Sequence, residues 1–121
     1  MSYKNEFKNC LDGLFESLCD VSDWMYENPE LGFEEFKTSK YLVDYIQKNS
    51  KSVNYPSHGL ETAFDITFGE EGPLTVICVE YDALPEIGHA CGHNIIATAS
   101  IGAGLSLKDI ASKLGIRVKL L

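Results

Sequence analysis

The sequence predicts an α/β fold in which helices pack on a small sheet. Apolar residues recur every three or four positions in two early segments, about 7–28 and 34–49, as one-sided helices require. Two later segments, 62–68 and 74–79, are short and rich in β-branched and aromatic residues, which is typical of strands. A further helical segment, 94–107, follows them, so helices and strands alternate along one chain.

The first predicted helix ends where proline enters the chain. Asn28 precedes Pro29, and the backbone before a proline disfavours the helical conformation. A second helix is predicted from about Glu34 to Asn49, followed by a polar run. Its predicted buried face consists of Phe36, Tyr41, Leu42, Tyr45 and Ile46.

The two predicted strands are expected to form a hairpin. Residues 62–68 alternate apolar and polar side chains, as a half-buried strand does. The glycine-rich turn 69–73 separates them from 74–79, a continuous apolar run suited to a more central strand.

The predicted third helix and the strand after it complete the fold. We expect Asn94 to cap a helix that runs to Leu107 or Lys113, with Gly115 closing it. Small residues within it would allow close packing on the sheet. Residues 117–121 predict the beginning of a further strand.

Length and charge restrict the class of protein. The 121 residues suit one compact unit or one piece of a larger one. A net charge of -8 opposes binding to nucleic acid or to anionic lipid. The most apolar stretch, 95–107, is shorter than the ~20 residues of a membrane-spanning helix. The amino-terminal segment does not resemble a secretory signal, so a cytoplasmic protein is expected.

Three of the four cysteines are interpreted as small core residues, and the fourth as a residue with a chemical role. Cys10, Cys19 and Cys78 lie in apolar surroundings, which is typical of small buried residues. Cys91 differs because histidines stand on both sides of it.

The segment 80–94 carries the candidate site. It follows a predicted strand and precedes a helix, where α/β folds collect ligands. His89, Cys91 and His93 are spaced two residues apart, so their side chains could point to one side of an extended loop. Imidazole and thiolate groups suit zinc and similar ions, and Asp82 could orient an imidazole. Three such residues are still fewer than the four ligands of a closed zinc site.

Three motifs in order, residues 28–35, 81–85 and 88–94, closely resemble one family. This is the amidohydrolase branch of the aminoacylase and carboxypeptidase zinc metallopeptidases, which includes hippurate, aminobenzoyl-glutamate and indole-acetyl amino-acid hydrolases. The resemblance implies the amino-terminal part of a three-layer α/β/α domain. Residues 1–121 would then be the first portion of the catalytic domain. The inserted lid and dimerisation domain and the carboxyl-terminal half, with a Glu-Glu pair and further ligands, would lie outside it.

The same resemblance implies roles for individual residues. Cys91 and His93 would be metal ligands, with Cys91 bridging two ions of zinc or manganese, and Asp82 would be the orienting carboxylate. His89 and Asn94 are possible site-lining residues. At the place of a first ligand found in many relatives outside this branch, the chain has Glu80. The pair Glu34-Glu35 is interpreted as ordinary acidic residues at a helix start, not as the family's Glu-Glu pair.

The implied function is metal-dependent hydrolysis of an amide bond in an N-acyl amino acid or dipeptide-like small molecule. A chain with two ligands is expected to bind metal weakly and to be inactive alone, and a homodimer is expected only for the full-length protein. Two alternatives stay open: a non-catalytic metal-binding module, and a thiol redox protein that uses Cys91. Metal-dependent stability without hydrolysis would favour the first, and chelator-independent alkylation of the thiol would favour the second.

Overall fold

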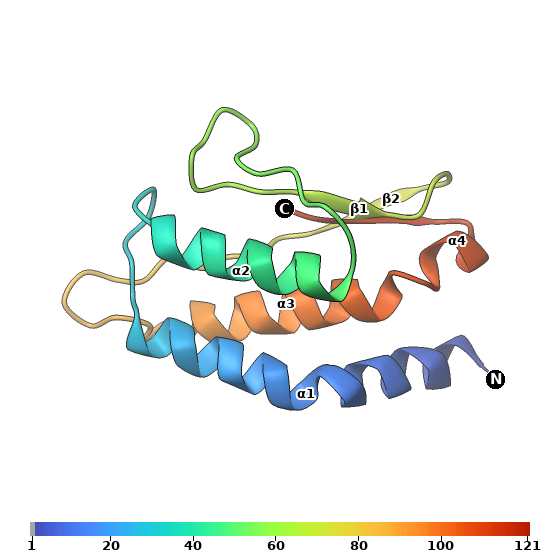
Figure 1. The fold of residues 1–121 in the computed structure, drawn as a ribbon, viewed down its shortest axis with the longest axis horizontal. Coiled ribbons are helices and arrows are strands. Elements are labelled where there is room, and N and C mark those ends of the chain that lie inside the picture. Colours follow the sequence, from blue (N-terminus) through green and yellow to red (C-terminus); the bar gives the residue numbers. More distant parts are fainter. Residues whose placement is uncertain (1) are drawn as a thin grey trace.

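The computed structural model describes residues 2–121 and confirms the α/β class (Figure 1). A three-stranded sheet lies on one side of the molecule, and helices stack beneath it. The elements in chain order are α1 (Tyr3–Glu27), α2 (Phe36–Asn49), β1 (Ile66–Phe68), β2 (Leu74–Ile77), α3 (His93–Leu107), α4 (Ala111–Leu114) and β3 (Arg117–Leu120).

Helix α1 begins four residues before the expected start because a serine caps it. The Ser2 hydroxyl accepts a hydrogen bond from the backbone N–H of Asn5 at 3.2 Å, which satisfies one free donor of the first turn. The helix ends at Glu27, directly before the Asn28-Pro29 pair, as predicted. One face is buried against the core and the opposite face is charged.

Helix α2 is capped by a carboxylate from the preceding turn. The Glu30 carboxylate accepts from the backbone N–H groups of Lys37 and Thr38, at 3.2 and 2.6 Å. Leu42 and Ile46 are fully buried, as predicted. The prediction for Phe36 is wrong, because its side chain is 51% exposed at the first position of the helix.

The predicted hairpin is wrong, because β3 lies between the two strands that were expected to pair. The sheet order is β1-β3-β2, with β3 antiparallel to β1 and parallel to β2. Glycines in the connecting turn allow this arrangement: a Cβ atom on Gly69 or Gly72 would overlap the backbone of residues 115–116, which lead into β3. In the described residues β2 is therefore an edge strand, and not the more central strand that its composition suggested.

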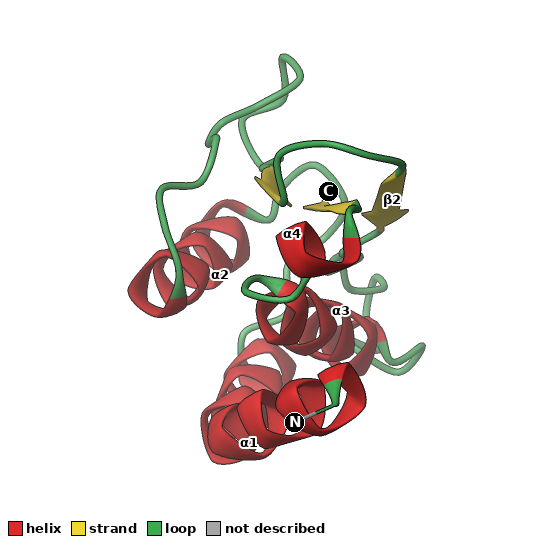
Figure 2. Cartoon of the chain, turned by 90° about the vertical axis from the view of Figure 1, so that its right-hand side faces the viewer, coloured by secondary structure: helices red, strands yellow, loops and turns green. Residues whose placement is uncertain are grey.

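Burial agrees with this strand order. Val118 and Leu120 of β3 are 1% and 0% exposed, whereas Leu74 and Val76 of β2 are 41% and 44% exposed. Within residues 2–121 the main helices lie on one face of the sheet (Figure 2), so the second helical layer of the expected three-layer domain is not seen there.

Helix α3 is the centre of the helical layer. It packs along α1 and against β3, and Gly104 leaves room for the side chain of Leu120. Its cap is Gly92, with φ of 87°, so the prediction that Asn94 caps the helix is wrong. Asn94 is the second residue of the helix, and its side-chain amide donates to the Ser22 hydroxyl at 3.1 Å, which ties α3 to α1. Helix α3 ends at Leu107, and Gly115 closes the short helix α4 instead.

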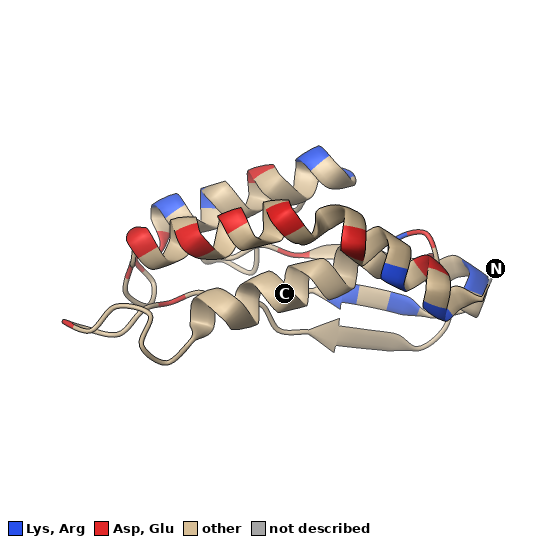
Figure 3. Cartoon of the chain, turned by 90° about the horizontal axis from the view of Figure 1, so that it is seen from below, with Lys and Arg blue, Asp and Glu red and all other residues tan. Residues whose placement is uncertain are grey.

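The surface is consistent with the acidic composition. Figure 3 shows that acidic positions recur along α1. Among the described residues, no helix combines the length and apolar character that crossing a membrane requires. The interpretation of the cysteines as core residues is wrong for two of them: Cys19 and Cys78 are exposed, and Cys10 is half-buried.

Candidate functional site

Two segments far apart in sequence meet at the carboxyl end of β2. The Ala83 N–H donates to the Glu30 carbonyl at 2.7 Å, and Leu31 forms a parallel bridge with Ala83. The turn that follows α1 is thereby attached to the loop that follows β2. This position outside a strand's carboxyl end is where α/β folds bind ligands.

His93 and Asp82 form the best-defined polar pair of the loop. The His93 Nδ1 atom lies 2.8 Å from Asp82 Oδ1 and 2.9 Å from the Asp82 carbonyl oxygen. With the proton on Nδ1, the ring donates to these oxygens and keeps a free lone pair on Nε2. This is the carboxylate–imidazole arrangement that orients histidines toward metal ions. The geometry fits the predicted orienting role of Asp82.

Glu80 faces the other side of the same imidazole. Its Oε2 atom lies 3.7 Å from His93 Nε2, and about half of its side chain is exposed. Glu80 was not predicted as a site residue, because the resemblance places a different ligand type there. A signal was present, since Glu80 and Asp82 are two residues apart in extended backbone and so point the same way.

The remaining predicted residues do not join this pair in one group. His89 is 4% exposed, and neither ring nitrogen has a hydrogen-bond partner within residues 2–121. Burial lowers the pKa of His89, and the nearby His93 lowers it further while Asp82 acts in the opposite direction. Cys91 is exposed. The amide nitrogen of Asn94 is bonded to α1 at Ser22, so it is not directed toward His93.

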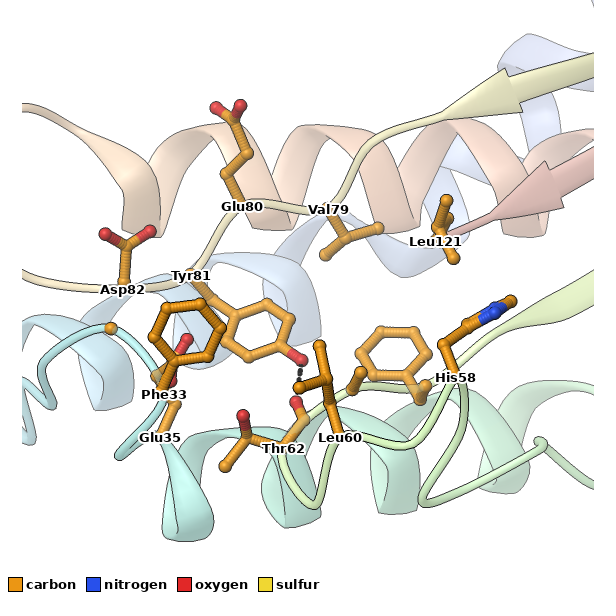
Figure 4. A pocket seen from close by; sticks show the side chains of 13 residues that line it. Phe33, Glu35, His58, Leu60, Thr62, Val79, Glu80, Tyr81, Asp82 and Leu121 are labelled. Atoms are coloured by element: carbon orange, nitrogen blue, oxygen red, sulfur yellow. Dashed lines mark hydrogen bonds between the residues drawn. The ribbon is translucent and has the colours of Figure 1, made fainter.

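A cleft of about 540 Å³ opens beside Asp82 (Figure 4). Its walls come from the turn after α1, the segment before β1 and the segment after β2, and they are mainly apolar. The labelled lining residues are Phe33, Glu35, His58, Leu60, Thr62, Val79, Glu80, Tyr81, Asp82 and Leu121.

Glu35 is a cleft residue whose burial was not expected from the sequence. Its Oε1 atom is buried and has no hydrogen-bond partner in the described residues. Burial raises the pKa of the Glu35 carboxyl above its ordinary value, and the nearby charge of Asp82 raises it further. The interpretation as an ordinary helix-start acid suits Glu34, which is exposed. It does not suit Glu35, because Glu30 caps the helix in its place.

The donor types suit a divalent ion, but the described residues form an incomplete set. The free Nε2 of His93 and the carboxylate of Glu80 are groups that zinc and manganese accept. Within residues 2–121, no three His, Cys, Asp or Glu side chains are arranged to hold a metal ion. The expected grouping of His89, Cys91 and His93 is thus not seen.

An oriented imidazole and a carboxylate at the carboxyl end of a strand are features of metal-dependent hydrolases. The chain is 28% identical over 113 residues to one of the subunits of p-aminobenzoyl-glutamate hydrolase from Escherichia coli, covering 79% of this chain and 24% of the relative. It is 33% identical over 115 residues to human Xaa-Arg dipeptidase. This match covers 82% of this chain and 26% of the dipeptidase. No protein-family model matches the chain.

Solved structures agree on the fold. A dinuclear metal-binding peptidase of the M20 family from Bacillus subtilis superposes with a TM-score of 0.75 and 24% identity, covering 90% of this chain and 34% of that one. A putative aminohydrolase from methicillin-resistant Staphylococcus aureus superposes with a TM-score of 0.76 at 20% identity. The superposition covers 96% of this chain and 33% of that one.

The chain is therefore similar to amidohydrolases and dipeptidases and shares the fold of an M20 peptidase, in agreement with the resemblance of its three motifs. It spans about a quarter of the length of the curated relatives it matches.

Proposed function

We propose that residues 1–121 are the amino-terminal portion of a catalytic domain that hydrolyses the amide bond of an N-acyl amino acid or dipeptide-like molecule with two divalent ions, zinc or manganese. The supporting observation is the imidazole of His93, held by Asp82 on one nitrogen and facing Glu80 with the other. The names of the relatives support the substrate class, since they are hydrolases and dipeptidases that act on small amides.

Each residue has a definite part in this proposal. Asp82 accepts a hydrogen bond from the Nδ1–H group of His93, which fixes the tautomer and leaves Nε2 free to hold an ion. Cys91 supplies a thiolate, and His89 lines the buried side of the loop. A divalent ion held there would supply Lewis-acid chemistry, lowering the pKa of water and polarising the amide carbonyl.

Two ligands from this segment hold an ion weakly, so the 121-residue chain is expected to be inactive alone. The homodimer belongs to the full-length protein. A cytoplasmic location is consistent with four cysteines that are all free.

Cobalt binding tests the ligand set directly. Co²⁺ bound to thiolate produces an intense near-ultraviolet absorption, so titration of the chain should show this band and Cys91→Ala should abolish it. His93→Ala should weaken binding by about tenfold or more. The matched control is Cys19→Ala, because Cys19 is also exposed but lies on α1. Loss of the band in the control variant, or its persistence in Cys91→Ala, would reject the ligand assignment.

Hydrolysis provides the second test. Purified 121-residue chain with Zn²⁺ or Mn²⁺ should release no amino acid from an N-acetyl amino acid above background. Turnover that Cys91→Ala abolishes would disprove the expected inactivity of the isolated chain.

A further inference from the structure

A single peptide unit lies between the turn after α1 and the imidazole of His93. The N–H of the 82–83 peptide bond donates to the Glu30 carbonyl at 2.7 Å. The carbonyl oxygen of the same peptide bond, that of Asp82, lies 2.9 Å from His93 Nδ1. This bond is trans, so its N–H and C=O point in opposite directions within one rigid plane. A contact that fixes the direction of the N–H therefore also fixes the acceptor that faces His93.

The imidazole of His93 has two acceptors from one residue, and they differ in freedom. The Asp82 carboxylate, 2.8 Å from Nδ1, belongs to a side chain that is 40% exposed and can rotate. The Asp82 carbonyl cannot turn away without breaking the bond to Glu30. A hydrogen bond to the N–H of a peptide unit also polarises its C=O, which makes the carbonyl a better acceptor. The backbone therefore contributes to the orientation of His93 together with the carboxylate.

Glu30 is itself fixed through its side chain. One carboxylate oxygen accepts from the Lys37 N–H at 3.2 Å and the other from the Thr38 N–H at 2.6 Å. Hydrogen bonds to an ionised group are stronger than neutral ones, and both donors belong to the first turn of α2. The carboxylate of Glu30 thus binds the helix while its carbonyl binds the loop, so α2 holds that carbonyl in place.

The preceding residue holds only the other side of Asp82. Tyr81 is 8% exposed, and its ring stacks on that of Phe64 with centroids 5.9 Å apart. Its hydroxyl donates to the Thr62 carbonyl (Figure 4). These contacts fix the chain before Asp82, and they leave the plane of the 82–83 peptide to the bond with Glu30.

We propose that Glu30 is a positioning residue for His93: its carboxylate, bound to the first turn of α2, holds the Glu30 carbonyl, which orients the 82–83 peptide toward Nδ1. This inference rests on the proposed function, in which Nε2 of His93 holds a divalent ion. It adds a connection from α2 to the metal site through one residue and one peptide bond. Loss of an outer contact of a ligating histidine changes metal affinity by about 10–100-fold, so the role of Glu30 is measurable.

Hydrogen exchange in the metal-free 121-residue chain tests the connection. In Glu30→Ala, the Ala83 amide and the His93 Nδ1 proton should both exchange with water about fivefold faster or more, because their hydrogen bonds weaken. Glu30→Gln keeps one of the two acceptors, so it should give intermediate rates, and it provides the same comparison if Glu30→Ala does not fold. The matched control is Ser2→Ala, which removes the cap of α1 at a similar cost in stability and should leave both rates unchanged.

Cobalt binding separates this inference from the proposed function. Glu30→Ala should bind Co²⁺ about tenfold more weakly than Ser2→Ala does, with the same thiolate band at saturation. If the wild-type chain binds no Co²⁺, the proposed function fails, and the exchange rates alone then confirm or overturn the role of Glu30.

Three results would overturn the inference. The first is unchanged exchange of the Ala83 and His93 protons in the Glu30 variants, and the second is an equal acceleration in Ser2→Ala. The third is a Co²⁺ affinity of Glu30→Ala equal to that of Ser2→Ala, which would mean that Glu30 serves only the stability of α2.

Discussion

Replacing Gly104 by alanine should destabilise the protein even though alanine is the better helix former. Gly104 lies in α3 where that helix packs on β3. A Cβ atom at this position would lie 2.6 to 2.8 Å from three side-chain carbons of Leu120, which is fully buried. The leucine is confined by the core and has little freedom to move away.

The magnitude follows from two opposing terms. Alanine in a helix interior is favoured over glycine by about 1 kcal/mol. Overpacking a well-packed core by one methyl group costs about 1–3 kcal/mol. We therefore expect Gly104→Ala to lose about 1 kcal/mol. The matched control is Gly13→Ala in α1, where a Cβ meets no atom within 4 Å and only the helix-forming gain of about 1 kcal/mol remains.

Urea unfolding followed by circular dichroism measures both variants. The two midpoints should move in opposite directions, by free energies that differ by about 2 kcal/mol. In a double-mutant cycle, Leu120→Ala should cost less when Gly104 is already alanine, because the overlap is then removed. Equal stabilisation by Gly104→Ala and Gly13→Ala would refute the close packing of α3 on β3.

Three further predictions concern carboxylates near the site. Glu30→Ala should lower the free energy of unfolding by about 1 kcal/mol, because α2 loses its cap, whereas exposed Glu34→Ala should be close to neutral in the same urea assay. The folded-state pKa of Glu35 is raised above 4.5, so folding favours its protonated form. The free energy of unfolding of the wild type should therefore fall, relative to that of Glu35→Gln, as the pH rises from 4.5 through the folded-state pKa. A difference in unfolding free energy that does not change with pH would contradict this. Asp82→Asn should weaken Co²⁺ binding about tenfold with unchanged stoichiometry, and unchanged affinity would remove its orienting role.

Helices were predictable from the sequence because their burial pattern is local. The apolar period of α1 and the proline after it depend on neighbouring residues alone, so both its type and its end were predicted. Its start was missed because the Ser2 cap precedes the first apolar position. The wrong prediction for Phe36 has a similar cause, since a helix-end residue can follow the apolar period and still project into solvent.

Strand order was not predictable in the same way, because it depends on contacts between distant segments. Adjacent strands joined by a short glycine-rich turn usually form a hairpin. Here the glycines serve a different purpose, since they let the backbone of residues 115–116 approach the turn and bring β3 between the two strands. Nothing within residues 62–79 distinguishes these two uses of glycine.

The site shows where a spacing argument fails. Residues two apart share a face only in extended backbone, and Glu80 and Asp82 satisfy that condition. The loop that carries His89 and Cys91 does not, because Glu86, Gly88 and Gly92 all have positive φ and turn the chain repeatedly. His89 is consequently buried while Cys91 is exposed, although these two residues are two positions apart, just as Glu80 and Asp82 are. The Co²⁺–thiolate band tests directly whether Cys91 joins His93 at one ion.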